Sequence, residues 1–227
     1  MNLRHRTAAL TAAAALAVSG LALAPAAQAA TPTAAPAVVP AATGTTSLAS
    51  ILLADYGFDK NWNDYDLVTK AIVAVLTAKP NSPVKALTDG TVALTAFVPN
   101  DRAFQILVKS LTGKTLTRER SVFGAVASLG IPTIEAVLLY HVVPGATIDS
   151  AAALKANGAK LTTAGGGTFT VRVHPGPMIS LRDKDPNARN PRVILSQLDI
   201  NKGNAQIAHG IDRVLRPIDL PSKSRVS

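Results

Sequence analysis

The stretch that decides the fold runs from Ala136 to Ile148 and reads Ala-Val-Leu-Leu-Tyr-His-Val-Val-Pro-Gly-Ala-Thr-Ile. Apolar residues at helical spacing lead up to Tyr140 and His141, whereas two β-branched valines follow and run into Pro144-Gly145. We therefore expect a helix to hand over to a strand at Tyr140 and His141, with a turn after it. Both polar side chains lie in an apolar run, so they are either bonded within the core or contact a ligand or partner at its rim.

The composition favours one well-buried core built from aliphatic side chains. The chain has 227 residues, of which 48% are hydrophobic and only 4% aromatic, and this suits β-strands packed with short helices. Cysteine is absent, which excludes disulfides, thiolate zinc sites and a cysteine nucleophile. The formal net charge of +9 favours attraction to polyanions such as acidic polysaccharides, without defining a specific site.

The N-terminal residues predict export. Residues 1–29 combine a basic start, an apolar run and the small-x-small pattern Ala27-Gln28-Ala29, as in a secretory signal peptide. Residues 30–46 are rich in proline, alanine and threonine and carry no charge, which is typical of an extended or disordered spacer. We expect one domain over 47–219, a C-terminal tail over 220–227, secretion, and no membrane span after signal cleavage.

Hydrophobic periodicity and turn residues predict a mixture of helices and strands. The helix expected near Thr117 has Arg118-Glu119-Arg120 in its first turn, which we predict to be exposed to solvent. In chain order, we expect helices that begin at Ser47, at Asp64 or Asp66, at Asn100 or Asp101, near Thr117, at Pro132 and after Asp149. We expect strands over 91–98, 161–173 (a hairpin about Gly165–Gly167), 178–181, 193–195 and 206–215.

Three segments, which follow one another along the chain as 94–104, 137–143 and 208–217, resemble motifs of the fasciclin (FAS1) domain family. Residues 137–143 resemble its Tyr-His motif, here Tyr140 and His141. Residues 94–104 (LTAFVPNDRAF) resemble its first motif, a strand end followed by a helix start, and carry Thr95, Phe97, Pro99, Asp101 and Phe104. Residues 208–217 (AHGIDRVLRP) resemble its closing strand and carry His209, Ile211, Asp212, Val214, Leu215 and Pro217, with Gly210 where an apolar residue is usual.

The resemblance covers Ser47 to Asp219 and implies an α+β fold, a wedge or sandwich of β-sheet with several helices packed along it. It also implies an extracellular adhesion or interaction module that is not an enzyme. In animal members of the family, segments near the Tyr-His motif contribute to integrin binding, so the resemblance carries a binding role to Tyr140 and His141 by position. An Arg-Gly-Asp triplet does not occur in this chain.

Residues 182–192 (RDKDPNARNPR) predict an exposed, basic loop. Its cationic residues are the second set of candidate binding residues: Arg182, Lys184, Arg189 and Arg192. Calcium binding by Asp183 and Asp185 is disfavoured by their basic neighbours.

No catalytic or metal-binding motif stands out. The histidines His141, His174 and His209 lack metal-ligand spacing, so we predict no metal and no cofactor. Nucleic-acid binding is disfavoured because aromatic residues do not interleave with a basic stripe. The sequence therefore favours a secreted module, a monomer or weak homo-oligomer, that binds an extracellular protein or an anionic polysaccharide. The alternative is an extracellular hydrolase that acts on a polymer or ester through His141 and a nearby aspartate.

Overall fold

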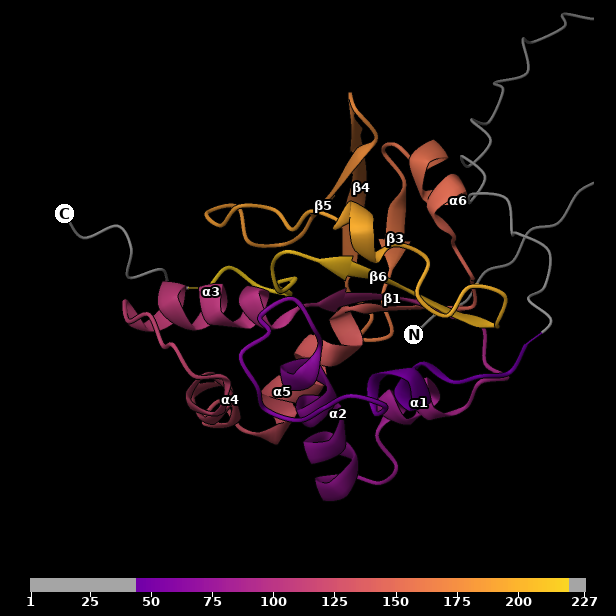
Figure 1. Ribbon diagram of the computed structural model, residues 1–227. Helices are drawn as coiled ribbons and strands as arrows, with labels where there is room; N and C mark the ends of the chain where they lie inside the picture. Colours follow the sequence, from indigo (N-terminus) through magenta and orange to yellow (C-terminus); the bar gives the residue numbers. More distant parts are fainter. Residues whose placement is uncertain (1–43, 221–227) are drawn as a thin grey trace, which may run out of the picture. The chain divides into compact units, whose positions relative to one another are not determined.

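A mixed three-stranded sheet organises residues 44–220, the part of the chain that the computed structural model describes (Figure 1). Strand β1 (Leu94–Pro99) lies in the middle, with β2 (Val142–Pro144) antiparallel on one side and β6 (Gln206–Ile211) parallel on the other. Every residue of β1 and β6 is buried. Both faces of this sheet are therefore covered, as is usual where strands pair in parallel.

The second sheet is an antiparallel meander of β3 (Lys160–Thr162), β4 (Thr168–His174) and β5 (Met178–Arg182). The segment that follows β5 joins it to the first sheet, because Arg192 pairs with Ser180 and Val193 pairs with Ile211. The rings of Phe97 and Phe169 meet edge to face between the sheets, with centroids 5.3 Å apart. Neither sheet closes into a barrel.

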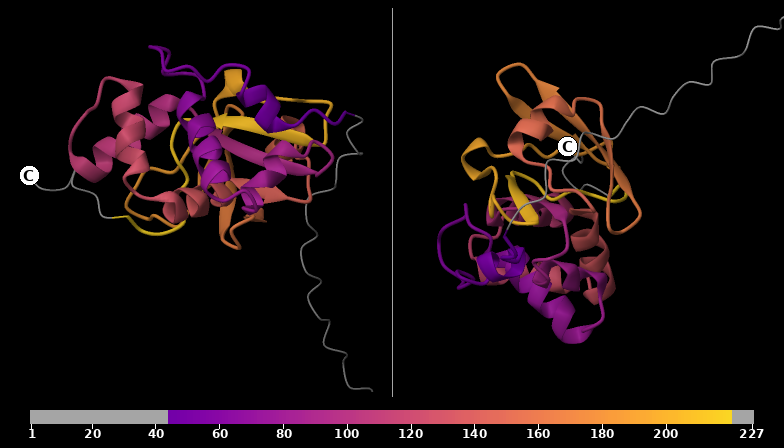
Figure 2. Two further views of the ribbon diagram at one scale, coloured as in Figure 1. Left: turned by 90° about the horizontal axis from the view of Figure 1, so that it is seen from below. Right: turned by 90° about the vertical axis from the view of Figure 1, so that its right-hand side faces the viewer.

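Helices cover the other face of the first sheet (Figures 1 and 2). Leu94, Ala96 and Val98 point from β1 into this helical core, whereas Phe97 points into the core between the sheets, as the alternation of a strand requires. The helices are α1 (Leu48–Leu52), α2 (Asp66–Ala78), α3 (Asp101–Thr112), α4 (Glu119–Ala127), α5 (Ile131–Tyr140) and α6 (Ser150–Lys155), with two 3₁₀ turns at Pro83–Thr88 and Leu195–Gln197. Of these helices, α6 packs on β4 in the second sheet.

The expected α+β class is confirmed, while several element boundaries differ. The last strand ends at Ile211 rather than Leu215, because its partner β1 ends opposite it at Pro99. Residues 193–195 form a single bridge and then a 3₁₀ turn instead of a strand. Glu119 is buried, so the expected solvated first turn of α4 is wrong at that residue.

The cap expected for α2 is also wrong. The N-cap residue is Tyr65, and neither Asp64 nor Asp66 caps the helix through its side chain. The backbone N–H of Leu67 instead donates to the Asp101 carboxylate at 3.0 Å. A side chain at the start of α3 therefore accepts a hydrogen bond from a backbone N–H in the first turn of α2, which has no partner within its own helix.

The predicted signal peptide, residues 30–43 of the spacer and residues 221–227 of the tail lie outside the described residues. The end of the spacer lies within them and is fastened to the turn before β6. The backbone N–H of Gly44 donates to the carbonyl oxygen of Gly203, and that of Thr46 donates to the side chain of Asn204, each at 2.9 Å.

Within residues 44–220, no single helix has both the length and the apolar character needed to cross a membrane. Helices α4 and α5 meet that threshold only as a pair, which is bent by 105° between them.

Candidate functional site

The junction of α5 and β2 buries both polar residues of the Tyr-His motif. Tyr140 ends α5 and His141 is its C-cap, and only 2% and 5% of their respective surfaces are exposed. The Tyr140 hydroxyl donates to the carbonyl oxygen of Thr168 at 2.8 Å. Burial raises the pKa of Tyr140 to about 12, so the hydroxyl remains a donor at neutral pH and ties the helix to the second sheet.

The His141 ring links α5 to the closing motif. Its Nδ1 lies 2.7 Å from the carbonyl oxygen of Val137, and its Nε2 accepts the backbone N–H of Leu215 at 2.9 Å. Because a carbonyl only accepts, Nδ1 carries the proton and the ring is neutral. Burial lowers the pKa of His141 to about 4. Both ring nitrogens are engaged, which favours the core interpretation of Tyr140 and His141 over the contact interpretation.

Replacing Tyr140 with phenylalanine should destabilise the domain by about 1 kcal/mol or more, because the carbonyl oxygen of Thr168 loses a buried donor. Urea unfolding of the wild type and the variant measures the difference. Tyr56→Phe is the matched control, since Tyr56 is 43% exposed and its substitution should change stability by less than about 0.5 kcal/mol. Equal stabilities for Tyr140→Phe and the wild type would contradict the buried bond.

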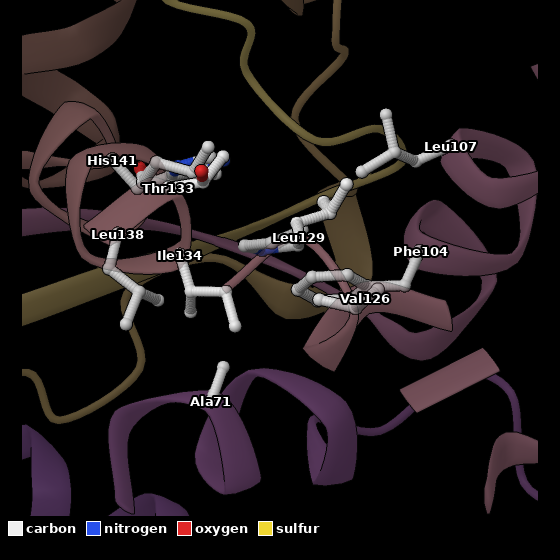
Figure 3. Close-up of a pocket in the computed structure, with 11 residues that line it drawn as sticks. Ala71, Phe104, Leu107, Val126, Leu129, Thr133, Ile134, Leu138 and His141 are labelled. Atoms are coloured by element: carbon white, nitrogen blue, oxygen red, sulfur yellow. The ribbon is translucent and has the colours of Figure 1, made fainter. Parts of the chain in front are cut away.

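A small apolar cavity adjoins His141 between the helices (Figure 3). Side chains from α2 to α5 converge on it, among them Ala71, Phe104, Ile134 and Leu138. Its volume is about 30 Å³, far below the roughly 300–1,000 Å³ of small-molecule pockets. The cavity is therefore a packing gap rather than a ligand site.

A groove of about 360 Å³ is lined in part by Tyr140. It lies between α5 and the glycine turn that joins β3 to β4, and Pro217 contributes to it. Gly167 packs so closely that a Cβ atom there would lie 2.7 Å from a ring carbon of Tyr140. A side chain at position 167 would clash with the buried ring, so a glycine is needed there.

Ser150, Asp199 and His209 bring a hydroxyl, an acid and an imidazole close together, but their hydrogen bonds do not match those of a catalytic triad. Ser150 Oγ donates to Asp199 at 2.8 Å, and His209 Nδ1 lies 3.9 Å from the other carboxylate oxygen of Asp199. His209 Nε2 is 2.8 Å from the carbonyl oxygen of Ile148 and is therefore a donor. In a nucleophilic triad the hydroxyl bonds to the imidazole, whereas here it bonds to the acid and the imidazole is buried.

The basic loop 182–192 is anchored to the closing motif through its own aspartates. Asp185 is buried and forms an ion pair with Arg216, with Nη1 2.8 Å from Oδ2. Asp183 accepts the backbone N–H of Arg216 at 2.8 Å. Burial alone would raise the pKa of Asp185, but hydrogen bonds from Arg216 and from the backbone at Asn187 and Ala188 hold it below its ordinary value.

The anchoring turns both acids of the loop inward and leaves its cations outside. Arg182, Lys184 and Arg189 are exposed and Arg192 is half-buried. None of these four side chains belongs to an ion pair formed within residues 44–220. The loop therefore presents positive charge on a fixed backbone.

The other motif residues hold the fold together. Thr95 Oγ1 donates to the carbonyl oxygen of Ala146 at 2.7 Å and accepts the N–H of Ile148 at 2.8 Å. Asp212 accepts the backbone N–H of Arg192 at 2.7 Å. Asn100 caps α3 through the N–H of Ala103, which frees Asp101 to cap α2. The apolar members are Phe97, Pro99, Phe104, Ile211, Val214 and Leu215, all buried, and Pro217, half-buried.

A carboxylate cluster that the sequence analysis missed lies where three helices begin. It consists of Asp59, Asp64, Asp66, Asp101 and Glu119. Ligand-capable oxygens of Asp59, Asp64 and Asp66 lie within 4.8 Å of one another, and so do those of Asp64, Asp101 and Glu119. Asp64 belongs to both groups, so the five carboxylates form one continuous set.

Burial dominates the electrostatics of the carboxylate cluster. It raises the pKa of Asp66 to about 6 and that of Asp101 to about 8, and the neighbouring carboxylates push in the same direction. The pKa values of Asp64 and Glu119 are also raised, chiefly by burial. None of the five forms an ion pair with a basic residue within residues 44–220.

Two features of the sequence could have drawn attention to this region, although neither defines the cluster. Residues 59–66 (DKNWNDYD) place oxygen-bearing side chains at alternate positions, a spacing typical of cation-binding loops. The second signal is Gly210, where the family usually has an apolar residue. A Cβ at Gly210 would lie 2.3 Å from the hydroxyl of Tyr65, so the glycine makes room for the tyrosine that follows Asp64.

Comparison with known proteins supports the resemblance. The family model described as the fasciclin domain matches residues 68–217. A similar solved structure is a FAS1 domain pair from the insect cell adhesion molecule fasciclin I, with a TM-score of 0.52 and 16% identity. The match covers 75% of this chain and 51% of that one, so this chain spans about half of its length. At this identity the likeness shows the fold alone. No match was found among curated proteins.

The motif segments, the two sheets with their helical layer, and a family match over 68–217 of 227 residues agree. The chain belongs to the fasciclin domain family.

Proposed function

We propose that this domain is an exported, non-enzymatic interaction module whose basic loop 182–192 binds an anionic extracellular partner, an acidic polysaccharide in the first place. Fasciclin domains are generally adhesion or interaction modules, and they occur in extracellular or cell-surface proteins. The solved domain pair that this chain resembles in fold comes from a cell adhesion molecule.

The observation that carries the proposal is the way the loop is held. Asp185 forms an ion pair with the Arg216 guanidinium, while Asp183 accepts the Arg216 backbone N–H. Asp185 therefore does not offset the exposed cations of the loop, which outnumber the one remaining acid, Asp183. A fixed backbone also loses little conformational entropy on binding. A repeating anion such as an acidic polysaccharide suits three exposed cations spread over eight residues, because it needs charge rather than a shaped pocket.

The hydrolase alternative finds no support at His141. A general base needs a ring nitrogen within reach of a substrate proton, and both nitrogens of His141 are bonded within the core. The groups around Asp199 and His209 do not present a hydroxyl to an imidazole either.

Neutralising the loop should weaken binding to a sulfated polysaccharide such as heparin by roughly tenfold or more at low salt, since each lost contact is electrostatic. The variant is Arg182→Ser/Lys184→Ser/Arg189→Ser, and its affinity is measured by surface plasmon resonance over a series of salt concentrations.

The matched control removes three exposed cations elsewhere, as Lys109→Ser/Lys114→Ser/Lys155→Ser. It has the same net charge as the loop variant and should retain most of the wild-type affinity. If the two triple variants lose affinity equally, binding reflects net charge alone and the loop has no special role.

A further inference from the structure

Six oxygens of the carboxylate cluster are buried and lack a hydrogen-bond partner within the described residues. Asp66, Asp101 and Glu119 each have at most 1% of their surface exposed. Among the described residues, both carboxylate oxygens of Asp64 and of Asp66, one of Asp101 and one of Glu119 have no hydrogen-bond donor. Buried polar atoms without partners are rare in folded proteins, and charged ones are particularly costly.

The N-termini of nearby helices stabilise only part of the negative charge of these buried carboxylates. The three helices α2, α3 and α4 begin at Asp66, Asp101 and Glu119, where negative charge is favoured. Backbone N–H groups satisfy one oxygen of Asp101, through Leu67, and one of Glu119, through Asp59 at 2.7 Å. The remaining oxygens converge on one another instead of on N–H groups.

A protonated Asp101 carboxyl can donate to Asp64, but the unpartnered oxygens of Asp66 and Glu119 remain. A cation from outside the described chain would serve all of these oxygens at once. Five carboxylates within two overlapping groups have the hard oxygen donors that calcium prefers, with no nitrogen or sulfur that would favour zinc. Calcium accepts six to eight oxygens in irregular geometry, whereas magnesium demands a near-ideal octahedron. A set assembled from a loop and three helix starts suits the ion with the less demanding geometry.

We infer that the carboxylate cluster is a calcium site, in which Asp64, Asp101 and Glu119 bind the ion and Asp66 and Asp59 complete or extend the set. The ion joins the loop before α2 to the first turns of α3 and α4. The backbone already brings these segments together, because Asp101 N–H donates to the carbonyl oxygen of Asp64 at 3.1 Å, and Arg102 N–H to that of Trp62 at 2.9 Å. Calcium thus fastens one edge of the helical layer.

The test uses the full chain, stripped with EDTA and then dialysed free of it. Isothermal titration with CaCl₂ should show saturable binding of at least one ion per chain, at roughly micromolar to millimolar affinity. Thermal unfolding should show a midpoint several degrees higher in CaCl₂ than in EDTA, because the ion binds only the folded chain. MgCl₂ at equal concentration should produce a smaller shift.

Asp101→Asn is the decisive variant. Asparagine retains the oxygen that accepts the Leu67 N–H but removes one charge from a crowded set, so the variant should fold and be at least as stable as the wild type in EDTA. Its calcium affinity should fall at least tenfold. Asp55→Asn is the matched control, because Asp55 is exposed and belongs to neither oxygen group.

Three outcomes would overturn the assignment. They are no calcium-dependent shift in the wild type, unchanged calcium affinity in Asp101→Asn, and a larger shift with zinc than with calcium. A second variant, Glu119→Gln, lies in α4 and tests whether a loss of affinity in Asp101→Asn comes only from a local change at the start of α3. It should lose calcium affinity while keeping its bond to the Asp59 N–H.

Discussion

Replacing Arg216 with methionine should destabilise the domain by about 3–5 kcal/mol, because it leaves the buried Asp185 carboxylate without its cation. The guanidinium also donates to Ser110 Oγ at 2.8 Å, so the substitution detaches the loop 182–192 from α3 as well. Urea unfolding measures the loss of stability. Limited trypsin digestion followed by mass spectrometry should show faster cleavage within the loop.

Two further variants distinguish the effect of breaking the buried ion pair from a general effect of losing an arginine. Arg213→Met should cost less than about 1 kcal/mol, because the Arg213 and Asp212 side chains pair where both remain partly exposed to solvent. Adding Asp185→Asn to Arg216→Met should recover part of the loss, since no unpaired charge then remains. The interpretation fails if Arg216→Met costs no more than Arg213→Met.

Acid should destabilise the domain through His141. The pKa of this ring is about 4 in the folded state and about 6.5 in an unfolded chain. Below pH 6.5 the unfolded chain takes up a proton that the folded ring refuses, so stability falls as the pH drops towards 4 and then levels off. Between pH 7 and pH 5 this one group should remove about 2 kcal/mol.

The effect is measured as a difference between the wild type and His141→Gln, because other groups titrate too. Burial lowers the pKa of His209, and the raised pKa values of Asp66 and Asp101 act in the opposite sense. These contributions are common to both proteins and cancel in the difference. Glutamine keeps an acceptor for the Leu215 N–H but does not titrate. In EDTA, the stability advantage of the wild type should shrink by about 2 kcal/mol from pH 7 to pH 5, and a constant advantage would refute the prediction.

The sequence predicted the parts of the fold that depend on local patterns. The helix-to-strand change at Tyr140 and His141, the strand before Pro99 and the Asn100 cap all follow from residues close together in the chain. The α+β class followed from these elements and from the family resemblance. Element ends were harder, because β6 stops where β1 offers no further partner.

The carboxylate cluster could not be predicted from any one segment. Glu119 lies between Arg118 and Arg120 and looks solvated in the sequence, and its burial arises only when α4 packs beside the loop 59–66. Likewise, Asp101 looked like a cap for its own helix and turned out to cap α2. A side chain's role depends here on segments brought together by tertiary packing, which local propensity does not contain.

The parallel pairing of β1 with β6 determines when the domain can fold. The Gln206 side chain in β6 also accepts the backbone N–H of Leu48 in α1, 158 residues earlier in the chain. Neither the first sheet nor the contact of α1 with it can therefore form before β6 is available. Such long-range closure makes folding slow. A polypeptide that emerges from the ribosome in N-to-C order therefore cannot complete its first sheet until residues 206–211 have been synthesised.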